Sequence, residues 1–282
     1  MSIRTILVPL AGSEDVTPVM EMGLTLGRDL GAHVDVLHIQ SDPKDTIPLL
    51  GEGMSVSMIE DMIQMAEKEG GERASDGRRT YDELVSKLSI TVSDDPTSQG
   101  PSTSWGQEVG RNDEVTARRG RLADLIVVAR PTESSDVLAT LTLNAALFDS
   151  GRPVLVAPPA GGGSAKALTP GGHVAISWNG SAQSARAVSS AMGLIAKAEK
   201  VSVFTAASDV TSASRAPELA TYLEWHGIVP DTRTFTIDGG QAIGGALLDP
   251  CGKKGGGRLV LGAFKPSRVS AFIPGGGGRP GL

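Results

Sequence analysis

The chain has 282 residues, 40% of them hydrophobic and 21% charged, which is typical of a soluble globular protein long enough for two domains. A net charge of −6 excludes a general electrostatic surface for nucleic acid or for an anionic membrane. No apolar run reaches the roughly 18 residues of a membrane span, and the single cysteine, Cys251, fits a cytoplasmic location without intrachain disulfides.

The N-terminal stretch has the pattern of a strand, a helix and a second strand. Residues 5–8 form a short apolar run, and Ser13 in the loop that follows is expected to cap a helix. The apolar residues of this helix recur at helical spacing: Val19, Met22, Gly23, Leu26 and Leu30. Gly31 ends it, and the alternating residues 33–40 indicate the next strand. A unit of this kind predicts a parallel sheet.

The interval between residues 41 and 120 contains two helical patterns and a loop-like segment. A helical stripe consists of Met58, Ile59, Met62, Ile63 and Ala66, and we interpret it as core, with a cofactor site as the alternative. Gly70 and Gly71 are expected to interrupt or end this helix. A further helix is expected through Tyr81, Leu84, Val85 and Leu88. Residues 97–106 have the composition of a loop.

Two more strands complete the first half. Residues 124–128 form an apolar run, and a helix follows through Leu138, Leu141, Ala145 and Leu147. The fifth strand is expected at residues 153–157. Residues 158–171 are rich in Pro, Gly and Ser, which is typical of an interdomain linker.

The second half repeats this plan from Gly172 onward. Residues 173–177 resemble the first strand of the chain, and Asn179, Gly180 and Ser181 precede a helix, as Gly12 and Ser13 do in the first half. Further strands are expected at residues 201–205, 232–237 and 258–261, with a helix opening at residues 242–248. The repeat predicts two α/β domains with parallel sheets.

The last of these strands leads into a glycine-rich segment that ends at Gly278. A loop of this kind at the carboxyl end of a parallel strand brings backbone N–H groups close to an anion. The segment resembles the nucleotide loop of the universal stress protein family, in which glycines and a hydroxyl residue stand at fixed spacing. Gly262 and Gly275 match two of the glycines, whereas Lys265 replaces a glycine and Gly276 replaces the hydroxyl residue.

The order of elements, taken twice, resembles a tandem universal stress protein of bacterial type. The best-matched pieces are residues 6–14, 124–131, 152–159 and 177–187 together with the glycine-rich segment. The resemblance implies two tandem open parallel-sheet α/β domains, Rossmann-like and similar to the adenine nucleotide α-hydrolases. We expect a first domain at 1–159 with a degenerate ligand loop, a linker at 160–171, and a second domain at 172–282. The second domain lacks its last strand, which indicates a truncated or altered C-terminus.

The resemblance also implies where a ligand binds. Family members that bind ATP have an Asp after the first strand, where this chain has Ala11 in the first half and Asn179 in the second. The loop at Ala129 lacks glycines, so we expect no phosphate site in the first domain. The candidate ligand residues are Asn179, Gly180, Ser181, Gly262, Lys265, Ser267, Arg268, Gly275 and Gly276. The alternatives are a tight turn with a helix cap at residues 179–181, and solvated cations at Lys265 and Arg268.

The family resemblance implies a stress-response protein that binds and signals rather than an enzyme. The candidate ligand is ATP or AMP, with magnesium bound alongside it, and the alternative is an interaction module without a ligand. A nucleotide hydrolase is disfavoured because neither Leu10 to Asp15 nor Trp178 to Gln183 supplies the SGGxDS loop of the related hydrolases. No Walker loop, HExxH or paired CxxC occurs, and the four histidines are scattered. We expect a homo-oligomer, most simply a dimer, formed through the edge strand at residues 153–157.

Overall fold

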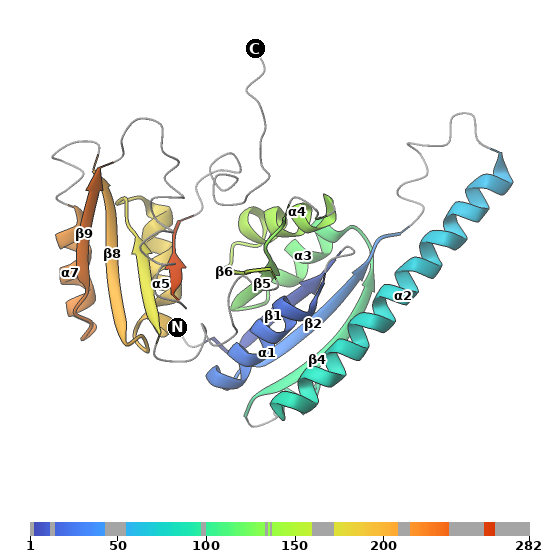
Figure 1. Ribbon diagram of the computed structural model, residues 1–282, viewed down its shortest axis with the longest axis horizontal. Coiled ribbons are helices and arrows are strands. Elements are labelled where there is room, and N and C mark those ends of the chain that lie inside the picture. The colour runs from blue at the N-terminus through green and yellow to red at the C-terminus, as the bar shows by residue number, and fades with distance from the viewer. Residues whose placement is uncertain are drawn as a thin grey trace, which may run out of the picture. The chain divides into compact units, whose positions relative to one another are not determined.

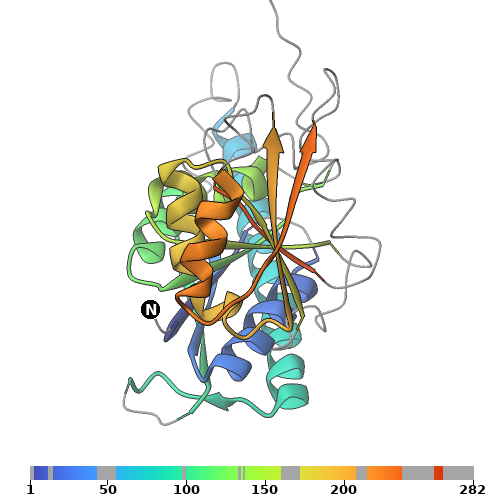
Figure 2. The ribbon, with the colours of Figure 1, turned by 90° about the vertical axis from the view of Figure 1, so that its left-hand side faces the viewer.

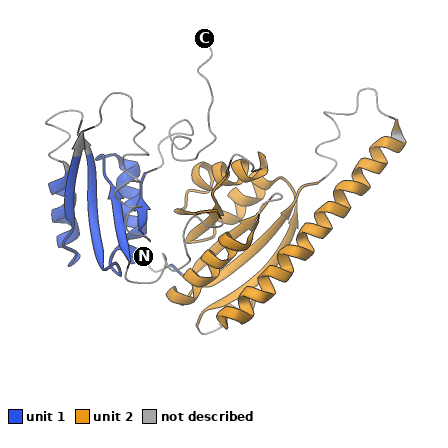
Figure 3. Ribbon diagram, viewed as in Figure 1, with its two compact units in different colours: residues 1–3, 161–282 blue, residues 4–160 orange. Residues whose placement is uncertain are grey.

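The computed structural model describes residues 3–11, 15–42, 55–96, 100–132, 135, 137–159, 172–207, 215–236 and 257–262. The chain divides into two compact units, shown in orange and blue in Figure 3. The N-terminal unit comprises residues 4–160, and the C-terminal unit comprises residues 161–282 together with residues 1–3. The predicted linker at 160–171 lies outside the described residues.

The N-terminal unit is built on a sheet of six parallel strands in the order β3-β4-β2-β1-β5-β6 (Figure 1). The strands are β1 (Thr5–Leu10), β2 (His33–Gln40), β3 (Thr91–Val92), β4 (Ser102–Val109), β5 (Leu125–Ala129) and β6 (Val154–Ala157). Its central strands are almost fully apolar and buried, as expected for a parallel sheet covered on both faces. The predicted parallel α/β fold is therefore confirmed.

Helices cover both faces of this sheet. α1 (Thr17–Leu30) and α2 (Val56–Leu88) pack against each other on one face, and α3 (Asn112–Gly120) and α4 (Val137–Asn144) pack together with the π-helical turn η3 (Ala145–Asp149). Gly31 ends α1 in a left-handed conformation, as predicted. The predicted cap at Ser13 is wrong, because α1 begins only at Thr17, and the Asp15 carboxylate accepts a hydrogen bond from the N–H of Thr17.

The two helices predicted on either side of Gly70 and Gly71 are one continuous helix of 33 residues, α2. The glycines do not interrupt it, because tertiary packing outweighs their low helix propensity of about 1 kcal/mol each. Gly70 is buried where a Cβ atom would lie 2.8 Å from the side chain of Gln40, so the small residue lets the helix approach the sheet.

The interpretation of the methionine stripe as core is also wrong. Of the predicted stripe, Met58 and Met62 are exposed to 52% and 42%, and Ile59, Ile63 and Ala66 are only half-buried. Met65, one turn further along, is exposed to 64%. They belong to the first half of α2, which extends past the sheet (Figure 1). The second half of the helix supplies the buried residues, among them Ala74, Tyr81 and Leu84.

The loop predicted at residues 97–106 contains the start of β4 instead. All eight residues of β4 pair with β2, from Ser102 opposite His33 to Val109 opposite Gln40. The polar side chains have partners inside the fold, since the Thr103 hydroxyl donates to the Val34 carbonyl over 2.8 Å. β4 begins with the polar residues Ser102, Thr103 and Ser104 and is therefore stabilised by its pairing with β2 and β3.

The C-terminal unit has four parallel strands in the order β10-β7-β8-β9. These are β7 (His173–Ser177), β8 (Lys200–Ala207), β9 (Asp231–Thr236) and β10 (Arg258–Val260). The helices α5 (Ala182–Ile195) and α7 (Arg215–Glu224) lie side by side on one face of the sheet (Figure 2). They form a core with it through side chains that include Val188, Leu219, Leu223 and Val203. The helix predicted at 242–248 lies outside the described residues.

The two sheets share a strand order. β7, β8, β9 and β10 occupy the places that β1, β2, β4 and β5 occupy in the N-terminal unit. Within the described residues, no strand of the C-terminal unit corresponds to β6, so β10 is an edge strand there. None of the described helices is long and apolar enough to cross a membrane.

Candidate functional site

Each sheet has a position at which the strand order reverses. It lies between β1 and β5 in the N-terminal unit and between β7 and β10 in the C-terminal unit. In open parallel sheets, ligands bind outside the carboxyl ends of the two strands that flank this position. These two corners of the fold are therefore the candidate sites.

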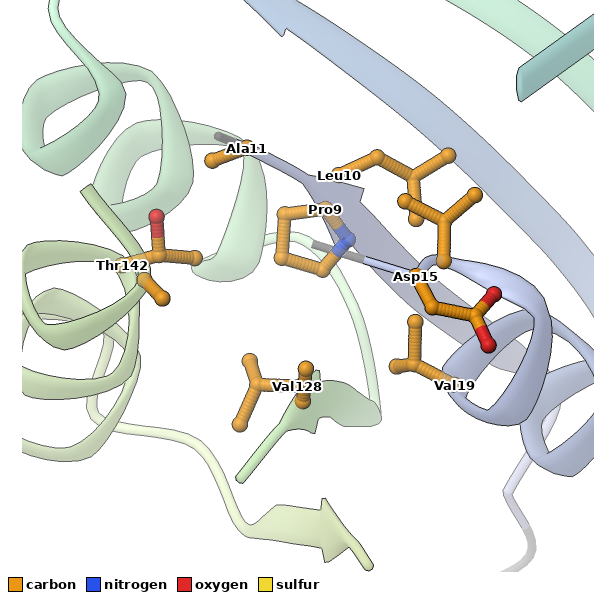
Figure 4. Close-up of a pocket in the computed structure, with 10 residues that line it drawn as sticks. Pro9, Leu10, Ala11, Asp15, Val19, Val128 and Thr142 are labelled. Atoms are coloured by element: carbon orange, nitrogen blue, oxygen red, sulfur yellow. The ribbon is translucent and has the colours of Figure 1, made fainter. Parts of the chain in front are cut away.

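In the N-terminal unit, this corner holds a small pocket with mostly apolar walls. Its lining comprises Pro9, Leu10, Ala11, Asp15, Val16, Val19, Val128, Ala129, Ala139 and Thr142. Figure 4 shows Pro9, Val19 and Val128 around the pocket, with Thr142 and Asp15 on opposite sides. The Thr142 hydroxyl is buried and has no hydrogen-bond partner among the described residues. Among the described residues, no lysine or arginine lines the pocket, so these walls supply no cation for a phosphate.

Asp15 places a negative charge at the start of α1. Its carboxylate oxygen accepts a hydrogen bond of 2.9 Å from the backbone N–H of Thr17. The positive end of the helix dipole favours an anion at this position, and the chain itself supplies that anion. A bound phosphate would be repelled by the carboxylate. The absence of a phosphate site at Ala11 and Ala129 stays a prediction.

A wider cleft adjoins the pocket and shares Leu10, Ala11, Asp15 and Val16 with it. One wall is formed by α2, and His38 lines the cleft near the end of β2. The charged residues that α2 contributes are Glu69, Glu72, Arg73 and Asp76. With Asp15, the lining holds four carboxylates against one guanidinium, so the cleft has the wrong sign for a nucleotide phosphate.

His38 is a buried histidine beneath α2. Its ring stacks on Trp105 with centroids 6.3 Å apart, and its Nε2 atom has no hydrogen-bond partner among the described residues. Burial lowers the pKa of His38 below its usual value, and the positive charge of Arg73 lowers it further. The ring is therefore neutral at pH 7. It is packed as a core residue.

The corner of the C-terminal unit brings together two segments predicted to form a site. β10 pairs with β7, with Val260 opposite Ile176, so the loop at residues 178–181 and Gly262 lie at the same edge. The Asn179 carboxamide oxygen accepts a hydrogen bond of 3.0 Å from the Ser181 N–H. Between them, Gly180 has a positive φ of 71°. These contacts form a tight turn.

Ser181 then caps α5. Its hydroxyl accepts a hydrogen bond of 3.2 Å from the N–H of Ser184, and its carbonyl accepts one from the N–H of Ala185. The turn-and-cap alternative considered for these residues is therefore present. Ala182 and Gln183 are left with N–H groups for which no acceptor lies among the described residues. Residues 178–181 and the first turn of α5 hold no carboxylate, whereas Asp15 lies just before α1.

Gly262 lies directly against this helix start. A Cβ atom at Gly262 would be 2.6 Å from the backbone nitrogen of Ser184 and 2.7 Å from the carbonyl carbon of Gln183. Only glycine fits at this distance, because both atoms belong to the backbone and cannot move aside. The glycine therefore holds the end of β10 next to the N-terminus of α5.

The structure thus brings together four of the predicted site residues, Asn179, Gly180, Ser181 and Gly262. Lys265, Ser267, Arg268, Gly275 and Gly276 lie outside the described residues. The sequence analysis missed Asp15 and the charged cleft along α2. Within the described ranges, no cluster of three or more His, Cys, Asp or Glu side chains is arranged to hold a metal ion.

One similar solved structure is a universal stress protein from Archaeoglobus fulgidus DSM 4304. It aligns with a TM-score of 0.56 at 12% sequence identity, over 87% of this chain and 82% of that chain. The chain has the fold of that universal stress protein. The resemblance stated from the sequence is thus confirmed at the level of the fold.

Two further solved structures are shorter. The universal stress protein UspA from Lactobacillus plantarum aligns at 15% identity with a TM-score of 0.41, over 56% of this chain and 99% of that chain. A universal stress protein in complex with cAMP aligns at 13% identity with a TM-score of 0.32, over 57% of this chain and 100% of that chain. Comparisons of the sequence with models of known families and with curated proteins give no match.

Proposed function

We propose that this chain is a tandem universal stress protein of bacterial type, a cytoplasmic protein that binds an adenine nucleotide in its C-terminal unit and signals a stress response. ATP or AMP is the expected ligand, with magnesium alongside a triphosphate. The N-terminal unit is a copy that does not bind phosphate. The proposal rests on the fold and on the different chemistry of the two corners.

The observation that carries the proposal is the contact between Gly262 and the start of α5. Gly262, which has no side chain, lies next to the N-terminus of α5 at the position where the strand order reverses. Free N–H groups and the helix dipole favour an anion at such a position. The corresponding helix start in the N-terminal unit carries Asp15 instead. The asymmetry supports a single phosphate site in the chain.

The residues after Gly262 would complete that site. In the proposal, Lys265 and Arg268 supply positive charge, Ser267 supplies a hydroxyl, and Gly275 and Gly276 supply backbone N–H groups to the phosphates. Asn179 would contact the nucleoside in place of the family's Asp.

We propose binding without turnover. His33 and His173 open strands and contact serine hydroxyls, with His33 Nδ1 2.9 Å from the Ser102 Oγ and His173 Nε2 2.9 Å from the Ser202 Oγ. Burial lowers the pKa of His173, and the positive charges of Lys200 and Arg233 lower it further. Such packing is typical of structural histidines and supports a binding role.

Calorimetric titration of the full chain with ATP and with AMP tests the proposal. We expect saturable heat with one site per chain for at least one of them. Release of inorganic phosphate should not exceed that of a sample without protein. A flat titration with both ligands would favour an interaction module without a ligand, and steady phosphate release would favour a hydrolase.

We also propose a homodimer formed through β6. This strand is at the edge of its sheet, and Val156 is 38% exposed, so an apolar edge is available for pairing. Light scattering after size exclusion should give twice the mass of one chain. Val156→Lys should shift the protein to a monomer, whereas Val137→Lys, at an exposed position of α4, should not. A wild-type monomer at tens of micromolar would contradict the dimer.

A further inference from the structure

The side of α2 that packs on the sheet continues along the first half of the helix, which extends beyond the end of the sheet. In the second half, the residues that face the sheet are buried and recur every three or four positions: Gly70, Ala74, Gly77, Tyr81 and Leu84. Ile59, Ile63 and Ala66 continue the same spacing toward the N-terminus, but they are only half-buried. Figure 1 shows this part of α2 extending past the strands.

The three exposed methionines widen this surface. At about 100° per residue, Met58, Met62 and Met65 adjoin the line of Ile59, Ile63 and Ala66, and together they cover an arc of about 160°. We call these six residues the methionine face. An exposed contiguous apolar surface indicates an interaction site. Methionine side chains suit it because they are flexible and polarisable and adapt to a partner.

The rim of the methionine face is acidic. Between Ser55 and Glu67 the helix carries Glu60, Asp61 and Glu67 and no lysine or arginine. At the same 100° spacing, Asp61 lies on one side of the face, and Glu60 and Glu67 lie on the other. The rim therefore favours a positively charged partner.

The acidic character continues into the cleft next to the methionine face. Glu69, Glu72 and Asp76 follow Met58, Met62 and Met65 at the same spacing and line the cleft. Glu69 pairs with Arg73 at 3.7 Å and Glu72 pairs with Lys68 at 4.0 Å, and between 42% and 78% of each of the four side chains is exposed. Exposed pairs of this kind are weak and exchange readily for a partner's cation.

We propose that the methionine face and its acidic rim bind a basic amphipathic helix of another protein. An amphipathic helix buries its apolar side in such a surface at positions spaced by three and four residues, and its lysines or arginines then meet the rim. A second copy of this face would bring like charges together, and an anionic membrane would be repelled. This interaction is independent of any nucleotide in the C-terminal unit.

The test uses a fluorescein-labelled 18-residue peptide of leucine and lysine with helical periodicity, titrated with the full chain and followed by anisotropy. We expect saturable binding that weakens as salt increases. The triple variant Met58→Gln, Met62→Gln, Met65→Gln should bind at least tenfold more weakly. Glutamine keeps the length and helix propensity of methionine, so circular dichroism should be unchanged.

A charge series separates the rim from general attraction to an acidic protein. Glu60→Gln, Asp61→Asn and Glu67→Gln together should weaken binding at least fivefold. The matched control is Glu199→Gln, Glu218→Gln and Glu224→Gln, which removes three exposed carboxylates from the C-terminal unit and should leave the affinity within twofold of wild type. Equal affinity in the methionine variant, or an equal loss in the control, would overturn the proposal. Self-association that disappears in the methionine variant would assign the face to a second copy and also overturn it.

Discussion

Replacing Gly262 with valine should destabilise the C-terminal unit by at least about 3 kcal/mol. The first carbon of any side chain would be 2.6 Å from the Ser184 nitrogen, so β10 and the start of α5 would have to move apart. Hydrogen exchange measured by mass spectrometry should show faster exchange in β7 and β8 and unchanged exchange in β1 and β2. The loss is large against a typical domain stability of about 5–15 kcal/mol.

The control for this variant is Gly71→Ala. A Cβ atom at Gly71 would meet no atom within 4 Å, and the residue lies on the exposed side of α2. Alanine should therefore stabilise the helix by about 0.5–1 kcal/mol. Wild-type exchange in Gly262→Val would show that the glycine does not hold the corner together, and the proposed site would lose its basis.

Replacing Tyr81 with alanine should cost the N-terminal unit about 3–5 kcal/mol. Tyr81 is 0% exposed, and its ring lies 5.5 Å from that of Trp105, with the Arg78 guanidinium 5.4 Å from the ring centre. The substitution leaves a cavity between α2 and β4, at the point where the helix is anchored to the sheet. Chemical denaturation followed by tryptophan fluorescence, to which Trp105 contributes, should show the lower midpoint.

Tyr222→Ala is the matched control. Tyr222 is 43% exposed and contacts the edge of the His226 ring on the surface of α7. Its removal should cost less than about 1 kcal/mol, because little buried surface is lost. An equally small effect at Tyr81 would mean that other contacts hold α2 to the sheet. Tyr81 would then not anchor the helix that presents the methionine face.

The sequence predicted the elements whose signals are local. Apolar runs gave β1, β5 and β7, and the Asn-Gly-Ser segment gave the turn and cap before α5. β4 was missed because Ser102, Thr103 and Ser104 become strand residues only through pairing with β2, which is distant in the sequence. Gly70 was taken for a helix break because its packing against Gln40 is a tertiary contact.

The same distinction applies to the candidate site. The carboxyl ends of parallel strands share one edge, so Asn179 and Gly262 could be placed together from the sequence. The role of Asp15 could not be predicted from the sequence, because it depends on where α1 begins. By residue preference, Ser13 is the better cap. The surface of α2 was misassigned since periodicity indicates an apolar stripe but not which part of it the sheet covers.

We propose that the chain has one nucleotide site and that it lies in the C-terminal unit. The direct measurement is hydrogen exchange of the full chain with and without saturating ATP and magnesium. We predict slower exchange in peptides that contain residues 179–184 and 258–262, and no change in peptides that contain residues 9–17 and 128–132. Protection beside Ala11 and Ala129 without protection beside Gly262 would contradict the claim.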